Sequence, residues 1–319
     1  MRIRVGTRKS ALARVQADKV SKLIHAADPS AEIEIVLLGS IGDTNKSASF
    51  LDIGSVGVFT KSGEDALLKN EVDVVVHSLK DLPTTQPDGL VLACVPERED
   101  PRDVLCGMTL EDIKADKHKI GTGSIRRAAQ MRVLFPGVTI VPVRGNVPPR
   151  LRRAIEKDGI DATILAASGL KRLGLVGADM DFMDAKTFPY AVAQGALGVE
   201  CRQSDEELIH LLKKFECAKS RAEVDAERAL MKYLGAGCNL PVGVCATWDN
   251  ATLHLKATVT GVDGLKQIVD EIAIEPHGTE EAGAVLAKRL LDKGAGELLR
   301  ATSLNVNTDK VETLLKTEK

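Results

Sequence analysis

Basic side chains recur at one kind of position in the first part of the chain, directly after an expected strand or at the start of the next helix. In open α/β sheets, ligands bind beyond the carboxyl ends of the strands, and helix N-termini at that edge favour anions. Arginine holds a carboxylate or phosphate through two parallel hydrogen bonds. Although a single arginine at a helix start is more often solvated surface, the repeated position favours one concentrated anionic ligand. The residues concerned are Arg8, Lys80, Arg126, Arg127, Arg144, Arg150 and Arg172.

Two further residues have side chains that could take part in a reaction, one a carboxylic acid and the other a thiol. Asp81 follows Lys80 and is the lone acid in this basic set. It is either a proton donor or simply a turn residue before Leu-Pro. Cys238 lies in LGAGCNLPVG, residues 234–243, where glycines and Pro241 exclude a helix. This predicts a thiol at the tip of a tight loop, although cysteines are usually buried. Alone, Cys238 is either an incidental thiol or an attachment point.

Alternating strand and helix patterns must position these residues. Two segments share one order of acidic residue, apolar strand, small residues and basic loop: EVDVVVHSLKDLP at 71–83 and GIDATILAASGLKRLG at 159–174. This weak internal echo predicts two similar α/β lobes with largely parallel sheets. We expect strands at 3–7, 31–38, 72–78 and 138–143, a strand leading into 119–124, and helices at 9–24, 60–69 and 125–134.

The character of the sequence changes near residue 216. A strong helical pattern at 218–234 leads to the cysteine loop. Alternating strands and a helix at 279–293 follow, ahead of a short polar tail. This order predicts a separate, smaller α+β domain at the C-terminal end.

Composition excludes several classes of protein. The chain has 319 residues, a net charge of −2 and only 3% aromatic residues, which argues against nucleic acid as a partner. No apolar run is long enough for a membrane span, and the charged start MRIRVGTRKS does not resemble a signal peptide. The six cysteines form no CxxC pair and no metal-ligand spacing with histidines, so we expect no metal.

Nearly the whole chain resembles the porphobilinogen deaminase family, also called hydroxymethylbilane synthase. The resemblance rests on motifs that occur in the family's order and approximate spacing. They are RVGTRKSALARVQ, VHSLKDLPT, EREDPRDVL, GTGSIRRAAQ, VRGNVPPRL, LAASGLKRLG, AVAQGALGVECR, ERALM and GAGCNLPVG.

The resemblance implies a transferase of tetrapyrrole and heme biosynthesis. Such an enzyme condenses four porphobilinogen molecules head to tail, loses ammonia each time, and hydrolyses the chain to 1-hydroxymethylbilane. Its dipyrromethane cofactor, built from two substrate molecules, is joined through a thioether to a loop cysteine, which Cys238 matches. Asp81 matches the catalytic aspartate, which hydrogen-bonds pyrrole N–H groups, helps deamination by proton transfer and stabilises the cationic azafulvene left behind.

The remaining site residues are carried over by the same resemblance. The implied cofactor-binding set is Cys238, Lys80, Asp81, Thr122, Ser124, Arg126, Arg127, Arg144 and Arg150. The implied substrate-binding set is Arg8, Ser10, Phe59, Arg172 and Gln194. The chain departs from the family pattern at a few positions: Val56 replaces a lysine, Ser62–Gly63 an acidic–apolar pair, Gly123 a small hydroxyl residue and Ala193 a glycine.

The implied fold is α/β, with two periplasmic-binding-protein-like lobes and a smaller α+β C-terminal domain. We expect domain 1 at 1–96 with 195–214, domain 2 at 100–190, and domain 3 at 218–319 carrying Cys238. The expected partners are porphobilinogen and its oligomers, with no nucleic acid and no membrane. We expect a monomer in the cytoplasm, or in a plastid if a transit peptide was trimmed. The alternative is a non-enzymatic two-lobed anion-binding protein, which leaves Cys238 unexplained.

Overall fold

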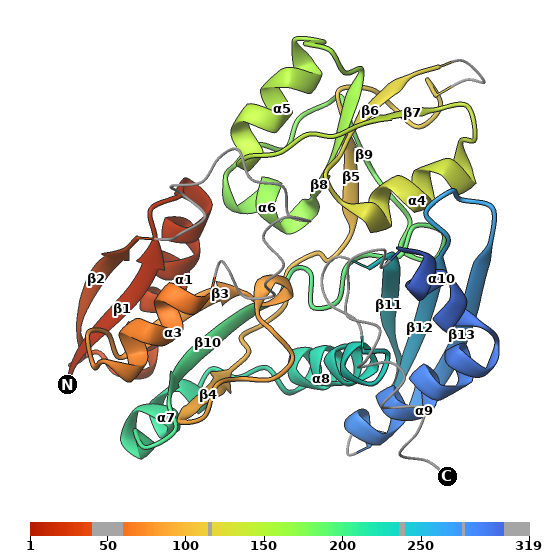
Figure 1. The fold of residues 1–319 in the computed structure, drawn as a ribbon. Coiled ribbons are helices and arrows are strands. Elements are labelled where there is room, and N and C mark those ends of the chain that lie inside the picture. The colour runs from red at the N-terminus through yellow and green to blue at the C-terminus, as the bar shows by residue number, and fades with distance from the viewer. Residues whose placement is uncertain (40–59, 114–116, 236–239, 276–277, 303–319) are drawn as a thin grey trace. The chain divides into compact units, whose positions relative to one another are not determined.

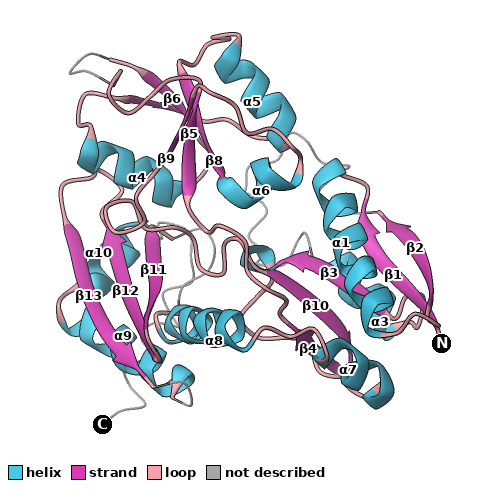
Figure 2. Cartoon of the chain, turned by 180° about the vertical axis from the view of Figure 1, so that it is seen from behind, coloured by secondary structure: helices cyan, strands magenta, loops and turns pink. Residues whose placement is uncertain are grey.

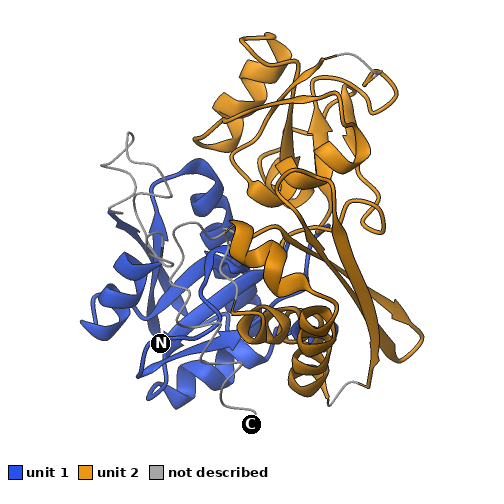
Figure 3. Cartoon of the chain, turned by 45° about the vertical axis from the view of Figure 1, so that its right-hand side comes forward, with its two compact units in different colours: residues 1–100, 194–221 blue, residues 101–193, 222–319 orange. Residues whose placement is uncertain are grey.

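The computed structural model describes residues 1–39, 60–113, 117–235, 240–275 and 278–302. The chain divides into two compact units, residues 1–100 with 194–221 and residues 101–193 with 222–319 (Figure 3). None of the described helices is both long and apolar enough to cross a membrane.

The first unit is built on a five-stranded sheet in the order β2-β1-β3-β10-β4. Strand β1 runs parallel to β2 and β3, whereas β10 runs antiparallel to β3 and β4. Helix α1 begins at its cap Ser10 and buries Ala17, Val20 and Ile24 against this sheet. The elements are β1 (Arg2–Arg8), α1 (Ala11–Ala27), β2 (Glu32–Leu38), α3 (Lys61–Leu68), β3 (Val74–Ser78), the short 3-10 helix η1 (Leu79–Asp81), β4 (Leu90–Cys94), β10 (Leu197–Arg202) and α7 (Glu206–Lys213).

The second unit contains a five-stranded sheet of the order β7-β6-β8-β5-β9. Strand β6 runs parallel to β7 and β8, and β5 runs antiparallel to β8 and β9. Figure 1 shows α4, α5 and α6 beside this sheet. The elements are β5 (Asp103–Cys106), β6 (Lys119–Gly121), α4 (Ile125–Leu134), β7 (Thr139–Val141), α5 (Val147–Ile155), β8 (Ala162–Ala166), α6 (Ala167–Arg172) and β9 (Met180–Phe182).

The two five-stranded sheets share one topology. Strands β2, β1, β3, β10 and β4 of the first correspond in order and direction to β7, β6, β8, β5 and β9 of the second. The echoing sequences fall on equivalent elements, β3 with η1 and β8 with α6. The expected α/β pair of lobes is therefore confirmed. The sheets are mixed rather than largely parallel. Strand β5 follows β4 of the first sheet but joins the second, and β10 follows β9 of the second sheet but joins the first. Each of the two runs antiparallel to both of its neighbours.

The second unit also contains a smaller antiparallel sheet, β11-β12-β13, with helices on one face (Figure 2). Leu253 and Leu255 of the sheet pack with Leu230 of α8 and Leu286 of α9. This is the expected α+β portion at the C-terminal end. Its elements are α8 (Ala218–Tyr233), whose first residues belong to the other unit, β11 (Val242–Asp249), β12 (Thr252–Thr260), β13 (Gln267–Ile274), α9 (Thr279–Asp292) and α10 (Ala295–Thr302).

A carboxylate clamps three strands of the first sheet. Asp73 accepts hydrogen bonds from the side chain and backbone of Arg4, at 2.8–3.0 Å, and from Arg202 at 2.8 Å. Burial raises the pKa of Asp73, but these hydrogen bonds outweigh burial and lower it to about 2. Because the folded pKa is depressed, the stabilisation is present above the unfolded pKa near 4 and is lost as the pH falls towards 2.

We therefore expect Asp73→Asn to lower the free energy of unfolding at pH 7 by about 1–2 kcal/mol. The difference from the unsubstituted protein should shrink between pH 4 and pH 2. Urea unfolding across this pH range is the measurement, with Asp88→Asn, an exposed acid of the same unit, as control. A difference that stays constant with pH would contradict the role of the clamp.

Candidate active site

The turn from β6 into α4 is shaped by two hydroxyl side chains. Thr122 is buried, and its hydroxyl accepts a hydrogen bond from the backbone N–H of Ser124 at 3.1 Å. Ser124 is the N-cap of α4, and its hydroxyl accepts from the N–H of Arg127 at 3.4 Å. Both hydroxyls thus fix the start of the helix that carries Arg126 and Arg127.

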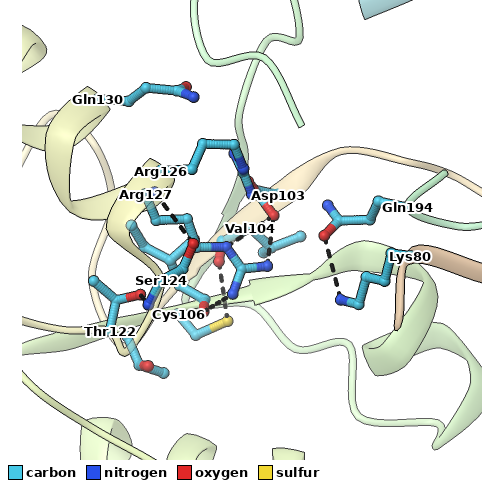
Figure 4. A network of polar contacts seen from close by, with 12 residues as sticks. Lys80, Asp103, Val104, Cys106, Thr122, Ser124, Arg126, Arg127, Gln130 and Gln194 are labelled. Carbon is cyan, nitrogen blue, oxygen red and sulfur yellow. Dashed lines mark hydrogen bonds and ion pairs between the residues drawn. The ribbon is translucent and has the colours of Figure 1, made fainter. Parts of the chain in front are cut away.

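Arg126 and Arg127 point inwards and share one carboxylate (Figure 4). Arg126 Nη2 lies 2.8 Å from Asp103 Oδ2, and Arg127 donates from Nε and Nη2 to Asp103 Oδ1 at 3.1 and 2.7 Å. Asp103 is fully buried, and the two arginines are 4% and 6% exposed. Charged groups this deeply buried must be paired and hydrogen-bonded. Asp103 is therefore what permits two guanidinium groups at this depth.

A third arginine joins the cluster from α5. Arg150 Nη2 donates to the carbonyl oxygen of Ile164 at 3.0 Å, and Arg127 Nη1 donates to the same oxygen at 2.9 Å. Arg150 Nε is buried and has no hydrogen-bond partner among the described residues. Burial lowers the pKa of Arg150 to about 10, and the positive charge of Arg127 lowers it further than Asp103 raises it. The cluster thus has an excess of positive charge that an anionic ligand would relieve.

The first unit contributes a separate polar group around η1. Lys80 Nζ lies 3.4 Å from Gln194 Oε1, and the backbone carbonyl of Gln194 accepts from Arg98 Nε at 2.9 Å. Gln194 is buried, whereas the Asp81 side chain beside Lys80 is exposed. An exposed carboxylate on a short, hydrogen-bonded turn next to a lysine suits proton exchange with a ligand.

The other site residues predicted from sequence are placed as follows. Arg8 ends β1, half-buried, and Ser10 caps α1. Arg172 ends α6, half-buried, while Arg144 is exposed in the loop before α5. Phe59 and Cys238 lie outside the described residues, as does Val56. The structure therefore brings Thr122, Ser124, Arg126, Arg127 and Arg150 together in one unit and Lys80, Asp81 and Gln194 together in the other.

Three departures from the family pattern have local steric explanations or consequences. A Cβ on Gly123 would lie 2.9 Å from the Val143 carbonyl oxygen, and one on Gly63 would lie 2.9 Å from Val75 Cγ1. Side chains at these positions would therefore collide in this fold. Ala193 has a φ of 57°, in the region that favours glycine, so alanine is strained where the family has glycine.

Asp103 was missed when the site was assigned from sequence. It lies in EREDPRDVL and begins β5, the strand that enters this sheet from the preceding lobe. An acid at the head of a fully buried four-residue strand is a signal that a cationic partner is needed, because an unpaired buried carboxylate is strongly unfavourable. His77 lies buried on β3, with Nε2 2.9 Å from Glu200 Oε2.

Two five-stranded sheets of one topology, with buried arginines at the start of α4, define an α/β protein built from two similar lobes. Residues 3–210 match the family profile "Porphobilinogen deaminase, dipyromethane cofactor binding domain", and residues 221–292 match "Porphobilinogen deaminase, C-terminal domain". The chain belongs to the porphobilinogen deaminase family.

Curated relatives named porphobilinogen deaminase match along almost the whole chain. The protein of Synechococcus sp. (strain RCC307) is 39% identical over 303 residues, which cover 93% of this chain and 95% of the relative. That of Geobacter sulfurreducens is 38% identical, with 93% and 94% covered, and that of Moorella thermoacetica 40%, with 93% and 96% covered.

Solved structures give a weaker likeness. The methionine-binding protein MetQ is 14% identical with a TM-score of 0.40, covering 71% of this chain and 93% of MetQ. The BenM effector-binding domain with benzoate is 16% identical with a TM-score of 0.39, covering 73% and 93%. At these TM-scores the likeness carries no argument about function.

Proposed function

We propose that the protein is a porphobilinogen deaminase: it condenses four porphobilinogen molecules, releasing ammonia at each step, and hydrolyses the product to 1-hydroxymethylbilane. The observation that carries the proposal is the Arg126–Arg127–Arg150 cluster, whose positive charge exceeds what Asp103 offsets. Pyrrole units bearing acetate and propionate groups are a chain of carboxylates of the kind such a cluster would bind. Family membership supplies the reaction.

The described residues fit a dipyrromethane cofactor covalently bound at Cys238. Arg150 Nε has no partner among the described residues, so a carboxylate there would receive a charge-assisted hydrogen bond. We assign Arg126, Arg127, Arg150, Thr122, Ser124, Lys80 and Arg144 to the cofactor, and Arg8, Ser10, Phe59, Arg172 and Gln194 to the incoming substrate and the growing chain. When bound, the cofactor supplies the free pyrrole position to which the first substrate is joined.

Asp81 is proposed as the catalytic acid–base group. Its exposed carboxylate accepts the N–H of a substrate pyrrole and thereby orients the ring. In its protonated form the carboxyl group gives its proton to the amine, the C–N bond breaks and its electron pair leaves with ammonia, and the resulting carboxylate stabilises the positive charge on the deaminated ring. It regains a proton when the ring carbon that forms the new C–C bond loses its hydrogen. Lys80, which contacts Gln194, binds a substrate or cofactor carboxylate beside it.

The proposal extends to partners and location. We propose a monomer that acts on porphobilinogen in the cytoplasm, or in a plastid, without nucleic acid or membrane. The net charge of −2 and the few aromatic residues support the absence of a nucleic-acid partner. The competing function, anion binding without catalysis, is not favoured by the match to the deaminase family.

Product stoichiometry tests the proposed reaction. The protein should consume porphobilinogen and release four molecules of ammonia for each linear tetrapyrrole that leaves. Ammonia and tetrapyrrole are quantified in the same samples over time. Binding of porphobilinogen without ammonia release would instead support the anion-binding alternative.

Arg150→Met should have opposite effects on the thermal stability of the cofactor-free and the cofactor-loaded protein. In a Cys238→Ser background, which cannot carry the cofactor, the change removes a half-buried charge whose pKa is already lowered to about 10. The Ile164 carbonyl keeps its hydrogen bond from Arg127. We expect the melting temperature to rise by about 2–4 °C in this background. With Cys238 present, the loaded variant should be less stable than loaded unsubstituted protein, because a carboxylate loses its partner.

Thermal unfolding of the four proteins checks this reversal of sign. Arg152→Met, which changes an exposed arginine on the same helix, is the control and should leave the melting temperature of both forms unchanged. A decrease in both backgrounds would mean that Arg150 is structural only.

A further inference from the structure

The carbonyl oxygen of Pro189 accepts two hydrogen bonds from α4. Arg126 Nη1 donates to it at 2.6 Å and Gln130 Nε2 at 3.0 Å. The two donors lie one helical turn apart, and both side chains are buried. Pro189 therefore holds the far side of the guanidinium that Asp103 holds at 2.8 Å.

The residue after Pro189 pairs with the edge of the small sheet. Tyr190 N–H donates to the Val244 carbonyl at 2.9 Å, and Val244 N–H donates back to the Tyr190 carbonyl at 2.8 Å. The Tyr190 hydroxyl accepts from the N–H of Ala246 at 2.7 Å. Since β11 is an edge strand of its sheet, Tyr190 extends that sheet by one short antiparallel bridge. Residues 189–190 thus join Arg126 to β11 within one compact unit.

A glycine of β11 lies against this junction. A Cβ on Gly243 would lie 2.8 Å from Gln130 Nε2, 2.8 Å from Pro189 Cβ and 2.9 Å from the Pro189 oxygen. Non-bonded carbon atoms normally sit about 3.5–4.0 Å apart. The backbone of Gly243 is not in the left-handed region, so close approach alone requires the glycine. Adding one methyl group would force β11, Pro189 or Gln130 to move by roughly half an ångström or more.

We propose that Gly243 and Gln130 are positioning residues that fix β11 against the Pro189 carbonyl and hence against Arg126. The inference rests on the proposed function. Strand β11 begins at Val242, four residues after Cys238. A cofactor joined to Cys238 and bound through its carboxylates to Arg126 would be held at two points, and the Gly243–Pro189 contact sets the separation between β11 and Arg126. Any error in that separation would displace the reacting end of the bound pyrrole chain.

The decisive experiment compares Gly243→Ala with Gly177→Ala, whose added Cβ would have Met180 Cε, at 3.9 Å, as its one neighbour within 4 Å among the described residues. Each protein is purified folded, and cofactor loading is measured by intact mass so that kcat is expressed per loaded molecule. Misplacing reacting groups by about an ångström lowers rates by up to about 10²-fold. We expect Gly243→Ala to lose about 10- to 100-fold in kcat, with KM changed by less than about threefold. Gly177→Ala should match unsubstituted protein.

A second variant keeps the inference testable if Gly243→Ala does not fold. Gln130→Met keeps the volume of the side chain and removes the hydrogen bond to Pro189, and it should lose a smaller, several-fold part of kcat. In addition, Gln130→Ala should partly restore the kcat of Gly243→Ala by vacating one of the three colliding atoms, which a double-mutant cycle would record as coupling.

Loaded Gly243→Ala or Gln130→Met that turns over within twofold of unsubstituted protein, with only a lower melting temperature, would overturn the inference and leave a packing role. Failure of the proposed function is distinguishable, because unsubstituted protein would then carry no added mass and release no ammonia.

Discussion

Replacing Asp81 by alanine is expected to lower kcat by about 10²- to 10⁴-fold, the effect typical of removing a positioned acid–base group. The side chain is exposed at the end of η1, so its loss leaves no buried group unpaired and should not unfold the protein. Building the cofactor needs only two condensations per protein molecule. A slow variant should therefore still acquire it during expression.

Steady-state ammonia release measures this loss, and intact mass confirms loading. Asp88→Ala, which changes another exposed acid of the same unit, is the matched control and should keep full activity. An Asp81→Asn variant separates proton transfer from orientation, because the amide oxygen still accepts a pyrrole N–H. Full turnover by loaded Asp81→Ala would remove this residue from the mechanism.

The second large effect is expected at Asp103. Asp103→Ala would leave Arg126 and Arg127 buried without their shared carboxylate. Breaking one side of a buried ion pair typically lowers the free energy of unfolding by about 3–5 kcal/mol. The variant should also bind the cofactor poorly, since each guanidinium loses the carboxylate that orients it opposite its backbone carbonyl. Denaturant unfolding and intact mass are the measurements.

A more exposed ion pair of the same unit provides the control for Asp103. Asp158 Oδ2 lies 3.3 Å from Arg153 Nε, and the Asp158 side chain is 70% exposed. Asp158→Ala should change the free energy of unfolding by no more than about 1 kcal/mol. If Asp103→Ala were equally mild, the arginine cluster would not depend on its carboxylate, and the electrostatic account of the site would be wrong.

Local sequence patterns were enough to predict those parts of the fold in which an apolar strand leads directly into a basic loop. The motifs around Lys80 and Lys171 gave equivalent elements, β3 with η1 and β8 with α6, because an apolar run followed by a basic loop is a local signal. The antiparallel directions of β5 and β10 were not predicted, since largely parallel sheets were expected. Their partners lie far away in sequence, and a short buried strand carries no mark of the direction in which it will pair.

The candidate site, too, could be predicted from local sequence only in part. The positions of Ser124, Arg126 and Arg127 at the start of α4 follow from the strand-to-helix pattern. The inward direction of the two arginines does not, since it depends on Asp103, more than twenty residues earlier, and on the Pro189 carbonyl. The close approach at Gly243 is likewise a tertiary contact that the glycine alone does not reveal. The three-domain division and the role of Cys238 stay predictions.

Intact-protein mass spectrometry of native protein beside Cys238→Ser tests the central claim most directly. The account predicts that native protein carries an excess of two pyrrole units, that this excess is absent from Cys238→Ser, and that only the native protein turns over porphobilinogen. Native protein that is folded yet stays at its bare polypeptide mass, even after incubation with porphobilinogen, would contradict the account and favour the anion-binding alternative.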